Sequence, residues 1–183
     1  DTAENTLMAF AVTDTAAIPR RSVVSDEKCE NCHSNLAFHG GNRHDPDYCV
    51  VCHMPESISR DGEQTIHFKY MVHALHRGSD LENGFAIGRH DYSEFEFPAE
   101  LSNCDNCHVN DSQQLPLPQG LLPTTTPQAF FDPAMPSAAA CLSCHDGASA
   151  AAHAHTNTTF FGESCATCHG ENKEYSVDKV HAQ

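Results

Sequence analysis

Ten cysteines in five pairs of identical spacing limit what this chain can fold into more than any other feature. Each pair has the form Cys-x-x-Cys, and the pairs are Cys29 with Cys32, Cys49 with Cys52, Cys104 with Cys107, Cys141 with Cys144, and Cys165 with Cys168. A histidine follows each pair at once, and these five are His33, His53, His108, His145 and His169. Cys-x-x-Cys-His is the attachment motif of c-type haem. The pattern therefore predicts five covalently bound c-type haems, with these histidines as the proximal iron ligands.

Two other interpretations of paired cysteines explain the pattern less well. Zinc sites built from Cys-x-x-Cys pairs take two pairs each, so five pairs do not divide evenly, and the histidines stay unexplained. A disulfide within one pair closes a very short loop and stabilises little. We therefore favour haem attachment.

The composition supports an interior that is not made of side chains alone. Hydrophobic residues make up 39% of the 183 residues, and tryptophan is absent. A chain of this length can bury a sizeable core, but the residues that usually fill one are scarce. The predicted fold is a multihaem cytochrome c with a haem core, mostly irregular loop with a few short α-helices and minimal β-structure.

The net charge and the hydropathy limit which partners the chain can bind and where in the cell it is expected. The formal net charge is −15, and ten haem propionates would add to it, so nucleic acid is excluded as a partner. No apolar stretch approaches the length of a transmembrane segment. Haem attachment of this type implies export, so we expect the protein in the periplasm or outside the cell.

A few segments show local structural signals. Residues 68–77 predict a helix that ends at Gly78, and residues 94–97 alternate like a short strand. The proline-rich stretch 116–136 predicts an irregular connection on the surface. We expect residues 1–20 to form a leader or the remnant of a preceding β domain, and residues 21–183 to form one pentahaem domain.

Nine further histidines are available for the distal faces of the haems: His39, His44, His67, His73, His76, His90, His153, His155 and His181. His73 and His76 lie on one face of the predicted helix and would serve two neighbouring haems. His39 precedes two glycines that let the backbone approach a macrocycle, and it would ligate a haem other than that of its own motif. Spacing alone leaves the choice of five open. The four methionines are alternative axial ligands, which we interpret as packing residues.

Several strings resemble a pentahaem domain of the OmcA/MtrC family of outer-membrane decahaem c-type cytochromes. The first runs from Cys29-x-x-Cys32-His33 through His39-Gly40-Gly41-x-Arg43 to Cys49-x-x-Cys52-His53-Met54-Pro55. Others are Met71–His76, the Pro98-x-x-Leu101-x-x-Cys104 approach, and Cys165-x-x-Cys168-His169-Gly170 with Val177-Asp178-x-Val180-His181. The resemblance covers about residues 20 to 183.

The resemblance implies distal ligands and a function. The distal histidines it implies are His39, His73, His76, His153 and His181, which leaves His44, His67, His90 and His155 as non-ligands. It implies electron transfer at the extracellular side of the outer membrane, to other multihaem cytochromes, metal oxides, metal chelates or flavins. The chain would be an electron carrier or a terminal Fe(III) reductase without a dedicated substrate pocket. Two alternatives stay open: a self-assembling subunit of an extracellular haem filament, and a multihaem reductase of a small anion.

Overall fold

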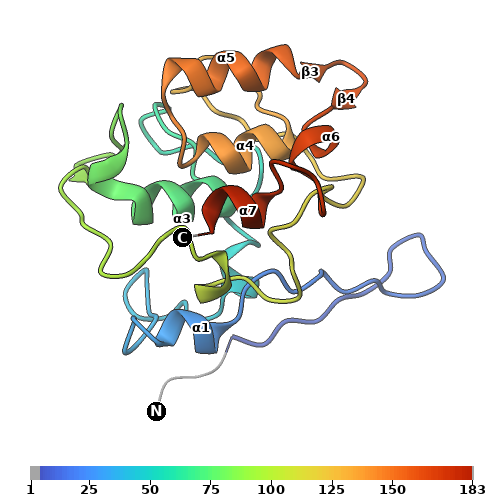
Figure 1. Cartoon of the computed structure of the whole chain (residues 1–183). Helices are drawn as coiled ribbons and strands as arrows, with labels where there is room; N and C mark the ends of the chain where they lie inside the picture. The colour runs from blue at the N-terminus through green and yellow to red at the C-terminus, as the bar shows by residue number, and fades with distance from the viewer. Residues whose placement is uncertain (1–4, 183) are drawn as a thin grey trace. The chain divides into compact units, whose positions relative to one another are not determined.

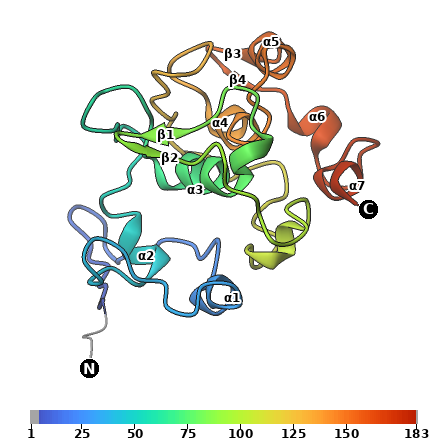
Figure 2. The same cartoon turned by 90° about the vertical axis from the view of Figure 1, so that its left-hand side faces the viewer.

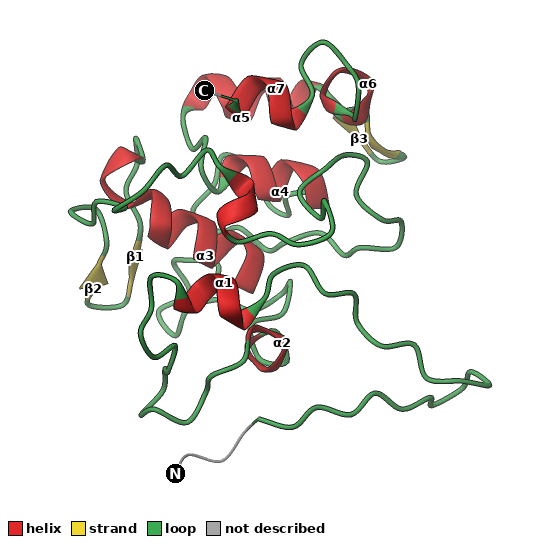
Figure 3. Cartoon of the chain, turned by 60° about the horizontal axis from the view of Figure 1, so that its bottom comes forward, coloured by secondary structure: helices red, strands yellow, loops and turns green. Residues whose placement is uncertain are grey.

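The structure is a computed structural model that describes residues 5–182; residues 1–4 of the predicted leader and Gln183 lie outside this range. The chain divides into two compact units, one of Asp1–Cys52 and Cys104–Gln113 and the other of His53–Asn103 and Gln114–Gln183. Short helices and two-residue strands are joined by long loops throughout (Figure 3). The structure has few short helices and little sheet, as predicted for the fold. The predicted boundary after residue 20 stays a prediction.

Unit 1 is built around short helices that lead into the motifs. Its elements are α1 (Asp26–Glu30), α2 (Pro46–Cys49) and the 3-10 turn η2 (Cys104–Asn106). The side chain of Ser25 accepts the N–H of Lys28 at 3.4 Å and so caps α1. Asp45 caps α2 in the same way, at 2.7 Å from the N–H of Asp47. These caps satisfy N–H groups that have no partner in the first helical turn, so the first and second motifs each lie at a helix with a fixed start.

Unit 2 holds the longer helices and two small hairpins. Its elements are α3 (Phe68–Arg77), η1 (Gly78–Asp80), β1 (Ala86–Ile87), β2 (His90–Asp91), α4 (Pro136–Leu142), α5 (Ala148–Thr156), β3 (Thr158–Thr159), β4 (Gly162–Glu163), α6 (Ala166–His169) and α7 (Val177–His181). Helix α4 lies between α3 and α5, which it contacts on opposite sides (Figure 1). The antiparallel hairpin β1–β2 lies beside α3 (Figure 2), and β3–β4 follows α5.

The hydrophobic core of unit 2 is small and made largely of alanine. One cluster gathers Tyr70 and Ala74 of α3 with Phe85, Ala134 and Ala139. A second cluster joins α4 to α5 through Ala138, Leu142, Ala151 and Ala154. Alanine lets helix backbones approach closely but buries little apolar area, so these clusters contribute modest stability.

Helix α3 has the predicted bounds, and its end has a clear cause. Gly78 adopts a φ of +47°, and a Cβ at this position would overlap the carbonyl oxygen of Phe95. The N–H of Ser79 donates to the same carbonyl at 2.9 Å. Glycine therefore stops the helix and lets the later segment pack against its end.

One local prediction is wrong and a second is only partly right. Residues 94–97 form no strand, because the carbonyl of Phe95 is used at the end of α3 and the rings of Phe95 and Phe97 lie against His76. The proline-rich stretch 116–136 is irregular and mostly exposed or partly exposed, as predicted. Within it, however, Thr124 and Thr126 are fully buried, and Thr124 pairs with Ala134 in an isolated bridge. Among residues 5–182, no helix has the length and apolarity needed to cross a bilayer.

Candidate haem-binding site

All five motifs adopt the same local turn. In each, the N–H of the second cysteine donates to the carbonyl of the first at 3.1–3.2 Å. In the first, third, fourth and fifth motifs the histidine N–H donates to that same carbonyl at 2.9 Å. This is one turn of helix, and positions i, i+3 and i+4 of a helix share a face. The turn therefore directs two thiols and one imidazole to the same side, as covalent haem attachment requires.

The fourth motif shows how such a turn meets the rest of its unit. The N–H of Cys144 donates to the carbonyl of Cys141 at 3.2 Å, and the N–H of His145 donates to the same oxygen at 2.9 Å. Cys144 is half-buried. Desolvation raises the pKa of Tyr70, and the nearby Asp146 and Cys144 add to that increase. The second thiol of this motif therefore lies close to the core cluster that contains Tyr70.

Haem attachment itself stays a prediction for each cysteine. The turns agree with it, because every motif has its two thiols and its imidazole at the spacing that attachment needs. The predicted thioether donors are Cys29, Cys32, Cys49, Cys52, Cys104, Cys107, Cys141, Cys144, Cys165 and Cys168.

Two predicted proximal histidines lie opposite two predicted distal ones. The ring centroids of His145 and His181 are 6.1 Å apart with an interplanar angle of 47°, and those of His153 and His169 are 6.1 Å apart at 88°. An imidazole nitrogen bonds a metal at about 2 Å, and its ring centre lies about 1 Å behind that nitrogen, so two rings on opposite faces of one iron have centroids about 6 Å apart. Both pairs have the spacing of bis-histidine ligation.

Several of the predicted ligand histidines are oriented through Nδ1. The acceptors are Ile66 O for His53 (2.7 Å), Ser143 Oγ for His73 (3.1 Å), Val72 O for His76 (2.8 Å), Ser112 Oγ for His108 (2.8 Å), Tyr175 O for His169 (2.8 Å) and Val177 O for His181 (2.9 Å). An Nδ1–H that donates in this way fixes the tautomer and leaves Nε2 to bind iron. Sequence reasoning missed these acceptors, because four are backbone carbonyls and the two serines carry no motif of their own.

The surroundings favour neutral imidazoles at two proximal positions. Burial lowers the pKa of His108, and the positive charges of Arg21 and Lys28 lower it further. Desolvation also lowers the pKa of His145, with a second contribution from His181 across the gap. Neutral imidazole is the form that binds a metal.

Thiols of different motifs lie close to one another within each unit. Desolvation raises the pKa of Cys29 to about 11, and the neighbouring Cys107 contributes to this increase. Desolvation likewise raises the pKa of Cys141 to about 11, with a contribution from Cys165. The first motif is therefore a neighbour of the third in unit 1, and the fourth is a neighbour of the fifth in unit 2.

The remaining predicted distal positions are on a tight turn and on α3. His39 has a φ of +51° and is followed by two glycines at +80°, and the turn is closed by a bridge between Phe38 and Arg43. A non-glycine residue in this left-handed region costs about 1 kcal/mol or more and often marks a functional position. His73 and His76 sit on α3 as predicted. His33 and His39 both lie in unit 1.

The four histidines predicted not to be ligands lie in different surroundings. His67 bonds through Nδ1 to the buried hydroxyl of Thr124 at 2.8 Å, and His155 lies edge-on to Phe131. His90 is exposed on β2, and the backbone N–H of His44 donates to Asn5 at 2.8 Å. Of the methionines, Met71 packs against the core cluster of unit 2.

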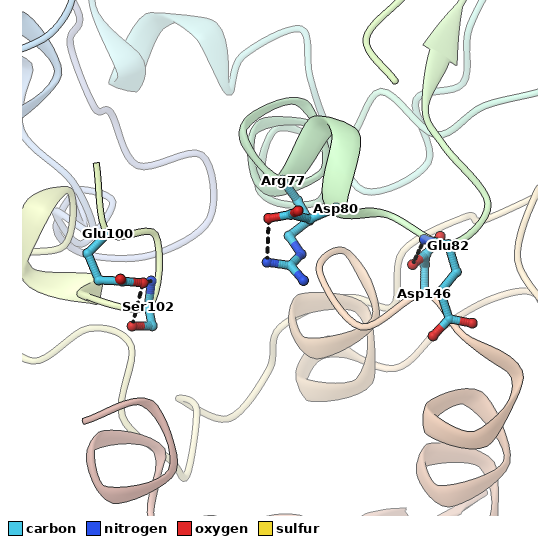
Figure 4. A network of polar contacts seen from close by, with 6 residues as sticks. All are labelled: Arg77, Asp80, Glu82, Glu100, Ser102 and Asp146. Carbon is cyan, nitrogen blue, oxygen red and sulfur yellow. Dashed lines mark hydrogen bonds and ion pairs between the residues drawn. The ribbon is translucent and has the colours of Figure 1, made fainter. Parts of the chain in front are cut away.

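A polar network holds the fourth motif against the loop after α3. The carboxylate of Asp146 accepts the N–H groups of Glu82 (2.8 Å) and Asn83 (2.7 Å). Figure 4 shows the contact of Asp146 with Glu82 and the ion pair of Arg77 with Asp80 at 3.0 Å. It also shows a separate turn in which Glu100 accepts from Ser102. Because Asp146 follows His145 directly, these hydrogen bonds fix the position of the backbone just after that histidine.

The turns, paired thiols and oriented imidazoles fit c-type haem, and comparison with known proteins agrees. A family model described as outer membrane cytochrome MtrC/MtrF-like, domains II/IV, matches residues 21–182. The chain therefore belongs to this family of outer-membrane multihaem cytochromes. The predicted family is confirmed, and with it the c-type haems and the outer-membrane location that characterise the family.

Particular relatives show how much of a longer protein the chain matches. It is 29% identical over 164 residues to the multiheme cytochrome MtrC of Shewanella baltica (strain OS185), which covers 87% of this chain and 20% of the relative. The crystal structure of the outer membrane decaheme cytochrome OmcA matches with a TM-score of 0.59 and 28% identity, over 92% of this chain and 25% of that one. The crystal structure of MtrC from S. baltica OS185 matches with a TM-score of 0.44 and 26% identity, over 92% of this chain and 22% of that one. The chain thus spans about a quarter or less of the length of these relatives.

Proposed function

We propose that this chain carries five covalently attached c-type haems, each with histidine on both faces, and passes electrons along them. The observation that carries the proposal is the 6.1 Å between ring centroids in two pairs, His145 with His181 and His153 with His169. These pairs support His181 as the distal ligand of the haem on the fourth motif and His153 as that of the haem on the fifth. His39, His73 and His76 complete the distal set for the other three.

The role of the chain follows from its ligands and their supports. When bound, each haem supplies one-electron chemistry, its iron alternating between ferric and ferrous. The chain contributes thioether anchors, imidazoles held through Nδ1, and neighbouring motifs within each unit. The closeness of the first and third motifs, and of the fourth and fifth, supports electron exchange within these pairs.

Histidine on both faces of every iron leaves no coordination position for a substrate. We therefore propose an electron carrier that reduces extracellular acceptors by contact, with metal oxides, metal chelates or flavins as acceptors and other multihaem cytochromes as donors. The reductase of a small anion needs an open face and has no support here. Because His181 faces His145 of the same chain, its use as a ligand to a neighbouring filament subunit also has none.

Haem stoichiometry and ligation test this proposal directly. The intact mass and the pyridine haemochrome assay should both give five haems per chain, and the ferric protein should be low-spin by electron paramagnetic resonance. The reduced protein should bind no carbon monoxide and should be reoxidised by citrate-chelated ferric iron. Fewer than five haems, or a high-spin fraction that binds carbon monoxide, would contradict it.

A further inference from the structure

Glu163, a residue outside the ligand set, connects the fourth and fifth motifs. It ends β4, and its carboxylate accepts the N–H groups of Ser137 (2.8 Å) and Ala138 (2.6 Å) in the first turn of α4. The residue before that helix, Met135, makes no capping bond. Glu163 therefore provides a charged cap from elsewhere in the chain, and such bonds are stronger than neutral ones.

The two ends of this connection each lead into a motif. Helix α4 contains Cys141, and Glu163 stands two residues before Cys165. Its negative charge reaches both thiols: after desolvation, it is among the causes that raise the pKa of Cys141 and of Cys165. The carboxylate is thus close to both sites of haem attachment.

Lys28 makes the corresponding connection in unit 1, with the opposite charge. Its ammonium donates to the carbonyl of Asp105, inside the third motif, at 2.6 Å, and to the carbonyl of His108. Lys28 directly precedes Cys29 of the first motif. One side chain again links the backbone of one motif to the start of another.

We propose that Glu163 and Lys28 are positioning residues, each of which fixes the spacing of two haems and shifts the reduction potentials of both haems in its pair. Because the two residues have opposite charge, the two pairs are shifted in opposite directions. The inference rests on the proposed function. Reduction adds one electron to a ferric haem, so a nearby anion opposes it and a nearby cation favours it. Glu163 should lower the potentials of the haems on the fourth and fifth motifs, and Lys28 should raise those of the first and third.

Spectroelectrochemical titration of the holoprotein tests the inference. Glu163→Gln removes the charge and one of the two acceptor oxygens, so about two fifths of the haem absorbance should titrate at higher potential than in the wild type. Lys28→Met keeps the apolar stem, and about two fifths should then titrate at lower potential. The rest of each curve should not move.

Three further variants separate charge, position and general effects. Asp91→Asn neutralises a carboxylate on β2 that accepts the N–H of Ser93 at 2.9 Å, and should leave the curve unchanged. Glu163→Asp and Lys28→Arg keep the charge on a side chain of different length, so the reduction potentials of the haems should stay near those of the wild type. Magnetic coupling between neighbouring ferric haems should change in Glu163→Asp, because the shorter side chain draws β4 closer to α4.

The outcomes distinguish this inference from the proposed function. Shifts in the same direction for Glu163→Gln and Lys28→Met, a uniform shift of all haems, or unchanged curves would overturn it while five low-spin haems remain. If the wild-type protein lacks five bis-histidine haems, the proposed function fails as well, and the stoichiometry and spin state measured on the same sample reveal this.

Discussion

At the scale of single residues, the proposed distal histidines distinguish an electron carrier from an enzyme with an open coordination position. His181 ends α7 with its Nδ1 bonded to Val177 O at 2.9 Å and its ring opposite His145. In His181→Ala, one haem should lose its distal ligand and become high-spin, so about one fifth of the haem should bind carbon monoxide. His155→Ala, which removes an exposed histidine of α5, is the control. Carbon monoxide binding equal in the two variants would contradict the assignment.

Ser112 holds the imidazole of His108, a predicted proximal ligand, through a hydrogen bond. Its buried hydroxyl accepts from His108 Nδ1 at 2.8 Å and donates to Val23 O at 2.7 Å. Ser112→Ala removes both of these hydrogen bonds, so the free energy of unfolding should fall by about 1–3 kcal/mol. Denaturant titration measures this loss. Ser22→Ala removes an exposed hydroxyl at 3.3 Å from Val24 O and should cost less than about 0.5 kcal/mol.

The attachment residues could be predicted from sequence, whereas most ligand pairs and supports could not. A Cys-x-x-Cys-His motif is local, and its helical turn follows from a few consecutive residues. The pairing of His145 with His181 needs the path of the chain through α5, β3–β4 and α6, which no spacing encodes. The resemblance named the distal set, but the ring pairs of His145 with His181 and of His153 with His169 required the structure.

At the scale of elements, Gly78 provides a sharp test of how α3 is ended. A side chain there would be strained at φ +47° and would overlap Phe95 O. Gly78→Ala should lower the free energy of unfolding by about 2–4 kcal/mol, combining backbone strain with a steric clash. Gly120→Ala has a similar positive φ of +82° with no atom near the added methyl, and should cost only about 1 kcal/mol. Equal losses in thermal unfolding would show that packing at Phe95 is unimportant.

Elements were predictable where local signals and long-range packing agree. Helix α3 combines good helix formers with a glycine stop, and the structure keeps the predicted bounds. The alternation at residues 94–97 satisfied the strand pattern, but a strand needs a partner, and the backbone there bonds to the end of α3 instead. Prolines in 116–136 correctly excluded regular structure, yet polarity did not reveal that Thr124 and Thr126 are buried. Their hydroxyls are satisfied locally or by His67, which makes burial possible.

At the scale of the whole molecule, the scarcity of apolar side chains makes stability depend on the cofactor. Ten hydrophobic residues are buried among those the structure describes, and six of these are alanines. A chain produced without haem attachment should therefore lose most of its helical far-ultraviolet circular dichroism, since little apolar area remains to offset chain entropy. A haem-free chain with native-like helicity and a cooperative thermal transition would contradict this expectation.

The strong negative charge should govern encounters with acceptors. At −15 before the propionates are added, the protein repels anionic chelates, and added salt screens this repulsion. Reoxidation by ferric citrate should become faster as ionic strength rises from about 10 to 150 mM, by roughly 3- to 10-fold. Stopped-flow absorbance measures the rate. A neutral acceptor should show almost no dependence, and a rate that falls with salt for the anionic chelate would point to a local positive docking patch.

His76 and His181 each donate an Nδ1–H hydrogen bond to a carbonyl of their own helix, Val72 O and Val177 O respectively. An imidazole tethered in this way cannot swivel about its Cβ–Cγ bond without giving up that contact. If these histidines bind iron as proposed, each would present Nε2 to the metal in the same direction in both oxidation states. Little nuclear rearrangement would then accompany each electron transfer, so electrons would pass quickly between neighbouring haems.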